Sequence, residues 1–286
     1  MPSFHFRPMN LQCGKYSLSL RRPLIMGVVN VTPDSFSDGG HYLRLDAAVD
    51  HARRLIDEGA DLLDIGGEST RPGAAAVSLD EERRRVLPVL EALASAGVPL
   101  SVDTQKPELM RDAVAAGAAM INDVNGFEAA DALTAVCSGN SAICIMHKQG
   151  SPQTMQQAPR YGDVVTDVSR YLQERVAAAE AAGIARERIV IDPGFGFGKT
   201  LEHNLALLRD LQRVAAPGIP VLAGLSRKSM IGALTGREVG ERVFGSVAAA
   251  LLAAQNGAAI LRVHDVAATR DALAVWNAVE SNKNND

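Results

Sequence analysis

Acidic and amide side chains stand at the ends of short apolar runs in this 286-residue sequence. Asp64, Asp103, Asn122 and Asp192 each lie within or directly after a run rich in Val, Ile and Leu. A buried carboxylate or amide has to be hydrogen-bonded, so we expect these side chains to accept from N–H groups of a ligand. A flat heterocycle with a guanidine-like edge presents such donors.

A second set of side chains has the opposite character. Arg71, Lys228, Arg262 and His264 supply N–H donors and positive charge, which suit the oxygens of a phosphate group. One ligand with a donor-rich ring at one end and a phosphate group at the other would satisfy both sets. The residue types therefore predict a site for a two-ended, anionic small molecule.

The glycine-rich run 194–200 invites a different interpretation, because it ends in Gly-Lys-Thr like a nucleotide-binding Walker A loop. That motif needs a glycine five residues before its last glycine, and Pro193 stands there. Lys199 likewise replaces the last glycine of the dinucleotide pattern Gly-x-Gly-x-x-Gly. We therefore expect these glycines to allow close backbone approach rather than to bind a nucleotide.

Eight apolar runs must position these residues, and longer amphipathic stretches separate the runs. Near-continuous apolar strands are typical of a parallel sheet that helices cover. The runs span 24–30, 62–66, 99–103, 120–124, 142–147, 189–192, 220–225 and 259–264. Eight strand–helix units predict an α/β fold of the closed (β/α)8 TIM barrel type, although periodicity alone leaves a doubly wound open sheet as the alternative.

Helical periodicity fills the stretches between the runs. Ser78 and Glu81 have the spacing of a capping box before a helix that we expect to reach about Ala96, and Pro107 stands where the next helix should begin. Further apolar stripes cover 45–56, 165–179, 202–214, 241–255 and 267–280. Catalytic groups of such a barrel lie at the carboxyl ends of its strands, which is where the polar residues stand.

The first residues form a separate small element in this prediction. Residues 3–20 alternate weakly around Cys13-Gly14-Lys15, which favours a hairpin that covers the amino-terminal mouth of the barrel. We expect residues 1–22 to form this N-terminal hairpin extension, 23–282 a single (β/α)8 barrel domain, and 283–286 a polar tail.

Composition excludes several classes of partner. The 29 basic and 33 acidic residues leave a net charge of −4, without the basic excess that nucleic-acid binding requires. The apolar run 247–254 is too short to cross a membrane, and residues 1–10 lack the apolar segment of a secretory signal. Three cysteines suggest reduced thiols, so we expect a cytoplasmic protein with small-molecule substrates, no nucleic acid and no membrane.

Eight blocks of the sequence resemble the bacterial dihydropteroate synthases, in the same order along the chain. They are 30–40 (NVTPDSFSDGG), 64–74 (DIGGESTRPGA), 102–104 (VDT), 121–124 (INDV), 146–147 (MH), 192–200 (DPGFGFGKT), 224–232 (GLSRKSMIG) and 262–266 (RVHDV). The resemblance implies a folate-biosynthesis transferase that joins 6-hydroxymethyl-7,8-dihydropterin diphosphate to p-aminobenzoate, yielding 7,8-dihydropteroate and diphosphate. It also implies Mg²⁺ as cofactor, a homodimeric barrel and a target of sulfonamides.

The resemblance further implies a role for each matching residue. The pterin set is Asp103, Asn122, Met146, Asp192, Lys228 and Arg262. The diphosphate set is Asn30, Thr70, Arg262 and His264, with Mg²⁺ at Asn30. The p-aminobenzoate set is Phe36, Thr70, Arg71, Pro72, Phe197 and Ser226. Catalysis would rest on Asp103, Asp192, Lys228, Arg262 and His264.

Some interpretations stay open at this stage. Asp64 fits a structural acceptor as well as a ligand contact, and we expect His147 and His203 to be structural. A pterin barrel that transfers methyl groups to a corrinoid protein would not need the Ser-Thr-Arg-Pro-Gly and Ser-Arg-Lys blocks. An idle pterin-binding module would not need Arg262 and His264, and an aldolase would carry its Schiff-base lysine on a strand.

Overall fold

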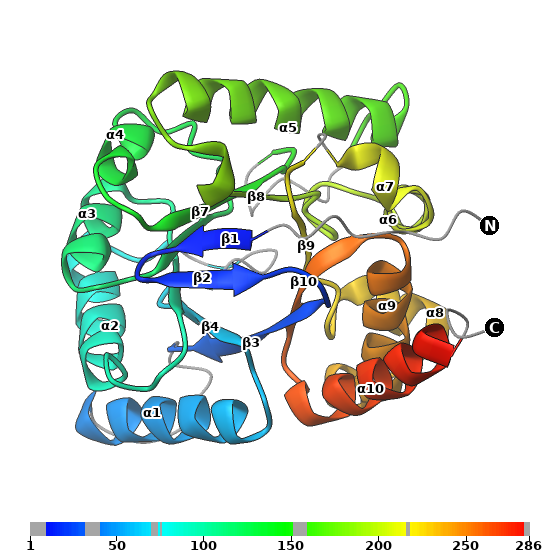
Figure 1. Cartoon of the computed structure of the whole chain (residues 1–286), viewed down its shortest axis with the longest axis horizontal. Coiled ribbons are helices and arrows are strands. Elements are labelled where there is room, and N and C mark those ends of the chain that lie inside the picture. Colours follow the sequence, from blue (N-terminus) through cyan, green and yellow to red (C-terminus); the bar gives the residue numbers. More distant parts are fainter. Residues whose placement is uncertain are drawn as a thin grey trace.

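The computed structural model describes residues 10–31, 41–69, 74, 76–150, 159–215 and 218–282. Eight parallel strands close into a barrel, in which β10 pairs with β3 to complete the ring (Figure 1). The strands are β3 (Leu24–Asn30), β4 (Leu62–Gly66), β5 (Leu100–Asp103), β6 (Met120–Asp123), β7 (Ala142–Met146), β8 (Ile189–Asp192), β9 (Val221–Ala223) and β10 (Ala258–Val263). The predicted TIM barrel is confirmed, and the open-sheet alternative is wrong.

Helices cover the outside of this barrel (Figure 1). They are α1 (His41–Asp57), α2 (Leu79–Ala92), α3 (Pro107–Ala115), α4 (Ala132–Cys137), α5 (Val164–Ala181), α6 (Leu201–Arg209), α7 (Leu211–Val214), α8 (Ser229–Thr235), α9 (Val243–Gln255) and α10 (Val266–Asn282). Two short 3₁₀ turns, η2 (Arg186–Arg188) and η3 (Val239–Glu241), precede β8 and α9. In the described residues, none of the helices combines the length and apolar character needed to cross a membrane.

Local chemistry explains where several helices begin and end. The Ser78 hydroxyl accepts a hydrogen bond from the Glu81 backbone N–H at 3.3 Å, and Pro107 is the first residue of α3, as predicted. Helix α2 ends at Ala92, four residues before the predicted end at Ala96. The single helix predicted over 202–214 is divided into α6 and α7, because the chain leaves the helix at Asp210.

Alternate residues of the strands face two different cores. Outward residues such as Ile65, Val102 and Ile121 pack with the covering helices in one apolar cluster. Inward residues near the amino ends of the strands, including Met120 and Leu222, form a second cluster inside the barrel. The period-two alternation of a strand thus separates a helix-packing face from an interior face.

The N-terminal hairpin closes the amino-terminal mouth of the barrel. Strands β1 (Asn10–Cys13) and β2 (Tyr16–Ser19) pair antiparallel, and Leu11 joins the apolar cluster inside the barrel. Gly14 in the turn has a φ of +59°, and a Cβ there would lie 3.0 Å from the Ala119 Cα. The turn therefore requires glycine for both its conformation and its close approach. Residues 1–9 of the predicted extension and the predicted tail 283–286 lie outside the described residues.

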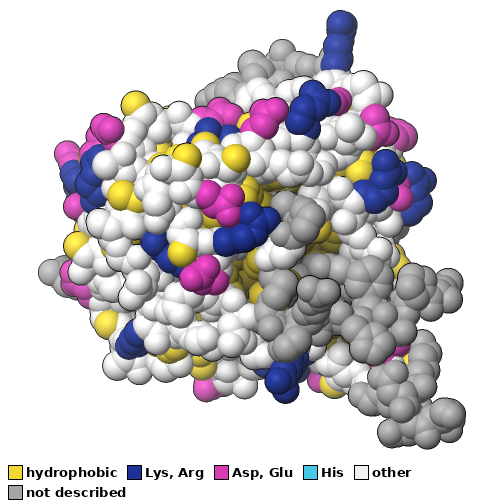
Figure 2. All heavy atoms as spheres, turned by 45° about the horizontal axis from the view of Figure 1, so that its top comes forward, with side chains coloured by type: hydrophobic (Ala, Val, Ile, Leu, Met, Phe, Trp, Pro, Cys, Tyr) yellow, Lys and Arg dark blue, Asp and Glu magenta, His cyan; other side chains and the backbone are white. Residues whose placement is uncertain are grey.

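Charged side chains of both signs are distributed over the surface. On the face drawn in Figure 2, the coloured Lys and Arg side chains stand among Asp and Glu side chains and form no continuous basic area. This distribution agrees with the net charge of −4.

Candidate active site

The interior of the barrel becomes polar toward the carboxyl ends of its strands. Residues at inward positions there come from six strands and meet across the barrel: Asp64, Asp103, Asn122, Met146, Asp192 and Arg262. Asp103 is in register with Asn122 and with Gly66, and Met146 is in register with Asp192. The predicted convergence of these side chains is therefore present.

Arg262 connects three of these strands through its guanidinium group. Its Nε donates to Asp64 Oδ2 at 2.6 Å, and its Nη2 donates to Asp103 Oδ2 at 3.1 Å. Asn122 Nδ2 also donates to Asp64 Oδ2, at 3.0 Å. Asp64 is completely buried and is held by both neighbours, so the structure places it within the polar set rather than apart from it.

One cation shared by two buried carboxylates leaves an excess of negative charge. Burial and the negative charge of Asp64 raise the pKa of Asp103 to about 8, although Arg262 opposes this shift. Burial likewise raises the pKa of Asp192, and Lys228 opposes it. The carboxylates are therefore poised to gain from further N–H donors or from a cationic ring.

Two oxygen atoms in this cluster have no hydrogen-bond partner among the described residues. They are Asp64 Oδ1 and Asn122 Oδ1, and both are buried. A buried acceptor without a partner costs about 1–3 kcal/mol, so such atoms mark the place where a ligand donor would bind. Gly224 lines the same interior, since a Cβ there would lie at ordinary contact distance, 3.9 Å from Asp192 Oδ2 and 3.8 Å from the Arg262 Cβ.

Lys228 lies beside the glycine-rich turn that follows β8. Its ammonium group donates to the Phe195 carbonyl and lies 4.6 Å from the centroid of the Phe197 ring. Burial lowers the pKa of Lys228 to about 8, while Asp192 opposes this shift. The contact with the ring is a cation–π interaction and brings two residues of the predicted site together.

Three glycines of this turn, Gly194, Gly196 and Gly198, have a positive φ, and two of them also lie against the backbone of another segment. Gly194 has a φ of +68°, and a Cβ there would lie 1.9 Å from the His147 carbonyl oxygen. Gly198 has a φ of +64°, and a Cβ there would lie 2.3 Å from the Gln149 carbonyl oxygen. Close backbone approach to the segment after β7 explains these glycines, as the sequence predicted.

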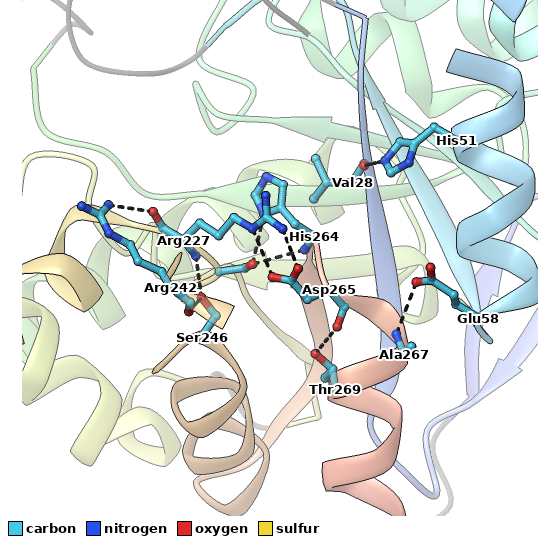
Figure 3. A network of polar contacts seen from close by, with 11 residues as sticks. Val28, His51, Glu58, Arg227, Arg242, Ser246, His264, Asp265, Ala267 and Thr269 are labelled. Carbon is cyan, nitrogen blue, oxygen red and sulfur yellow. Dashed lines mark hydrogen bonds and ion pairs between the residues drawn. The ribbon is translucent and has the colours of Figure 1, made fainter. Parts of the chain in front are cut away.

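Ser226 and His264 bring together the loops that follow β9 and β10. The Ser226 hydroxyl accepts from the His264 backbone N–H at 3.2 Å and lies 3.0 Å from His264 Nδ1. Figure 3 shows His264 beside Arg227 and Asp265 of the same two loops. These residues stand near Arg262, two positions before His264 on the same strand end.

Asn30 is half-buried at the carboxyl end of β3, next to Gly66 of β4. Among the residues the structure describes, no group of three or more His, Cys, Asp and Glu side chains could hold a metal ion. An Mg²⁺ ion usually takes one or two protein oxygens and completes its shell with phosphate oxygens and water. The amide oxygen of Asn30 could serve as one protein ligand of Mg²⁺, provided that a bound diphosphate and water supply the other ligands.

Some predicted site residues lie outside the described part of the chain. They are Phe36, Thr70, Arg71 and Pro72. The structure therefore brings together Asp103, Asn122, Met146, Asp192, Phe197, Ser226, Lys228, Arg262 and His264, with Asn30 at the neighbouring strand end.

Lys199, in the glycine-rich run 194–200, is a buried residue that the sequence did not assign to the site. Its Nζ lies 3.0 Å from His147 Nδ1 and donates to the Phe197 carbonyl at 3.1 Å. Burial lowers the pKa of Lys199 to about 7 and that of His147 to about 3. His203 completes a capping box with Thr200 at the start of α6, which is the structural role expected for it.

Comparison with known proteins defines the class. Residues 26–264 match the family described as pterin binding enzyme, so the barrel and its acceptor-rich interior are those of a pterin-binding enzyme. Dihydropteroate synthase of Escherichia coli K12 is 51% identical over 270 residues, covering 94% of this chain and 96% of that protein. The enzyme of Neisseria meningitidis serogroup B is 53% identical over 278 residues, covering 95% and 98%. The chain belongs to the dihydropteroate synthase family.

Solved structures agree with this assignment. The crystal structure of Burkholderia cenocepacia dihydropteroate synthase complexed with 7,8-dihydropteroate has a TM-score of 0.91 at 55% identity, covering 98% of this chain and 100% of that chain. The Xanthomonas albilineans enzyme with 4-aminobenzoic acid has a TM-score of 0.90 at 59% identity, covering 96% and 99%. The resemblance seen in the sequence blocks is confirmed, and the chain is a transferase of folate biosynthesis.

Proposed function

We propose that this chain condenses 6-hydroxymethyl-7,8-dihydropterin diphosphate with p-aminobenzoate, releasing diphosphate and forming 7,8-dihydropteroate. The observation that carries this proposal is a pair of buried oxygens, Asp64 Oδ1 and Asn122 Oδ1, which have no hydrogen-bond partner in the described part of the chain and lie beside Asp103 inside the barrel. A pterin edge supplies several N–H donors to such acceptors. The ligands of the two solved relatives, 7,8-dihydropteroate and 4-aminobenzoic acid, support both substrates.

We assign the pterin ring to the polar interior. Asp103, Asn122, Asp192 and Lys228 would hydrogen-bond its edges. Met146 and the guanidinium plane of Arg262 would pack against its faces, because a guanidinium stacks on flat aromatic systems. The buried position of Met146, with 4% of its surface exposed, is consistent with a contact inside the barrel.

We assign the diphosphate to the rim above the ring. Arg262 and His264 would bind its oxygens, together with Asn30 and with Thr70, which lies outside the described residues. Mg²⁺ would be held by the Asn30 amide oxygen and by the diphosphate, where it would neutralise charge on the leaving group. Ser226 and Phe197, with Phe36, Thr70, Arg71 and Pro72, would surround p-aminobenzoate.

The reaction breaks the bond between the exocyclic methylene carbon and the diphosphate oxygen. Electrons from the ring assist this departure, and the amine nitrogen of p-aminobenzoate then forms the new bond to carbon and loses a proton. Asp103 and Asp192 would stabilise the cationic ring, while Arg262 and His264 would stabilise the departing diphosphate. Preorganised groups of this kind contribute roughly 3–4 kcal/mol each, and alignment of two substrates contributes roughly 7–11 kcal/mol.

We further propose that the chain forms a homodimer in the cytoplasm. Large apolar side chains are exposed on α8, η3, α9 and α10: Leu234, Val239, Phe244, Leu252, Val275 and Val279. Phe244, at the start of α9, is 88% exposed. Apolar surface of this kind favours a protein partner, and the three free cysteines suit a reducing compartment.

The direct test mixes the purified protein with the pterin diphosphate, p-aminobenzoate and Mg²⁺ and follows the products by mass. We expect equal amounts of 7,8-dihydropteroate and diphosphate. A reaction without p-aminobenzoate is the matched control and should release no dihydropteroate. Absence of the product in the complete mixture would contradict the proposal, and transfer of a methyl group from a folate would support the corrinoid-linked alternative instead.

A further inference from the structure

Arg227 has a backbone conformation that side chains other than glycine rarely adopt. Its φ is +59°, in the left-handed region. A residue other than glycine is strained in this region, and the conformation persists where the surrounding structure over-determines it. The two neighbours of Arg227 along the chain are Ser226 and Lys228, both of which belong to the proposed substrate site.

Three contacts hold this conformation, and each uses a different part of Arg227 (Figure 3). Its backbone N–H donates to the Ser246 hydroxyl at 2.9 Å, and its carbonyl accepts from Arg242 Nη1 at 3.1 Å. Its guanidinium binds both carboxylate oxygens of Asp265, with distances of 3.1 Å from Nε and 2.5 Å from Nη2. A two-pronged contact of this geometry fixes the direction of an arginine side chain.

The ion pair also links the two loops that carry the rim of the site. Ser226 contacts His264, and the next residue in each loop forms the Arg227–Asp265 pair. Two consecutive residues of one loop are thus bound to two consecutive residues of the other. Asp265 is 15% exposed and Arg227 34% exposed at their side chains, so the pair is partly shielded from water.

We propose that Arg227 is a positioning residue, whose ion pair with Asp265 holds the left-handed backbone that directs Ser226 and Lys228 into the site. This inference rests on the proposed function, because it concerns the same substrates. The Arg227 guanidinium is itself engaged by Asp265, so we expect it to act through its neighbours rather than by binding substrate.

The variant Arg227→Gly removes the side chain and its ion pair without straining the backbone. Glycine adopts a φ of +59° without strain, so the fold should melt within a few degrees of the wild type while the ion pair is lost. We expect kcat/KM for p-aminobenzoate to fall at least tenfold, mainly through KM, with a similar fall in Asp265→Asn. Arg227→Lys keeps a cation and should recover part of the loss.

The matched control is Arg83→Ala, which breaks the pair between Arg83 of α2 and Asp112 of α3. Arg83 and Arg227 have the same side-chain exposure, 34%. We expect the control to keep kinetic constants within twofold of the wild type. Constants within twofold for both Arg227→Gly and Asp265→Asn would overturn the inference.

A second measurement does not depend on turnover. The ¹⁵N signal of the His264 imidazole reports its contact with Ser226, and it should shift in Arg227→Gly but not in Arg83→Ala. An unchanged signal in Arg227→Gly would count against the positioning role. A wild-type protein that formed no dihydropteroate would contradict the proposed function alone, and the histidine signal would still decide the role of Arg227.

Discussion

Asp103 and Asp64 share the single guanidinium of Arg262 inside the barrel. Because Asp103 is buried and lies close to the negative charge of Asp64, its pKa rises to about 8, and the carboxyl group gains a proton as pH falls below that value. A ring that donates N–H groups to the carboxylate favours its ionised form. We therefore expect binding of a pteridine to be coupled to loss of the proton from Asp103.

We predict that a pteridine binds with release of a proton below pH 8. Its affinity should rise with pH between about 6 and 8 and then level off, because Asp103 is already ionised above its pKa of about 8. Isothermal titration in buffers of different ionisation enthalpy measures the protons released. The variant Asp103→Asn should bind more weakly and without this proton release.

The pH dependence of the stability of the folded protein should reflect the same residue, Asp103. The pKa of Asp103 is higher in the folded protein than its ordinary value of 3.8, so the folded state binds more protons than the unfolded state between about pH 4 and pH 8. Its contribution to stability therefore falls as pH rises through this range. Asp103→Asn should show a flatter dependence of Tm on pH, and a variant with the wild-type pH dependence and pteridine affinity would refute the assignment.

The sequence predicted the position of some site residues but not of others. Asp103, Asn122 and Asp192 stand at the ends of apolar runs, so barrel geometry alone indicated that they would meet. The partner of Asp64 depends on closure of the ring, because Arg262 lies 198 residues away along the chain. Burial of Lys199 depends on how the turn after β8 packs, which no local pattern in the sequence encodes.

At the level of elements, near-continuous apolar runs predicted the strands closely. The runs 24–30, 62–66 and 189–192 have the observed bounds of β3, β4 and β8. Helices α4 and α8, with six and seven residues, were not predicted, since so short a helix shows too few turns to produce an apolar stripe. The break between α6 and α7 was also missed, because both halves continue the same stripe.

The loop after β4 is anchored by a buried charge cluster. Lys106, at the start of α3, donates to the carboxylates of Glu68 and Glu82. The Glu82 side chain is 1% exposed, and its Oε1 has no partner among the described residues. Burial alone would lower the pKa of Lys106, but the hydrogen bonds to the two carboxylates raise it. Glu68 stands two residues before Thr70, so this cluster fixes the base of the loop proposed to contact p-aminobenzoate.

We predict that Lys106→Met destabilises the protein by about 3 kcal/mol, because it leaves a buried carboxylate without its cation. The KM for p-aminobenzoate should rise more than the KM for the pterin diphosphate, since the base of only one loop is released. Denaturant unfolding and steady-state kinetics measure the two effects. The double variant with Glu82→Gln should recover part of the stability, and no recovery would argue against the unpaired charge as the cause.

At the scale of the whole molecule, exposed apolar side chains gather on the helices that end the chain. Phe244 of α9 is 88% exposed, whereas Leu205 on α6 is 39% exposed. We predict that Phe244→Arg converts the proposed dimer to a monomer at micromolar concentration, because the variant would bury a charge in an apolar contact. Sedimentation velocity gives the oligomeric state. Leu205→Arg is the control and should leave sedimentation unchanged, and equal behaviour of the two variants would contradict an interface at α9.

The amino-terminal end of the barrel is packed with apolar side chains, whereas the opposite end holds the proposed site. A variant at the amino-terminal end can therefore separate stability from activity. Leu11 of the hairpin is 1% exposed and packs into the apolar cluster at the amino-terminal end, opposite the polar interior. Leu11→Ala should therefore lower the free energy of unfolding by about 2–5 kcal/mol, because it leaves a cavity in that cluster.

At 25 °C the same variant should keep kcat/KM within twofold of the wild type, since Asp64, Asp103 and Arg262 are positioned by the upper halves of the strands. Leu18→Ala, at a partly buried position on the same hairpin, should cost less stability. A tenfold loss of activity in folded Leu11→Ala would mean that packing at the hairpin end sets the geometry of the opposite mouth. The barrel would then transmit strain along its strands, and stability and catalysis would not be separable by position.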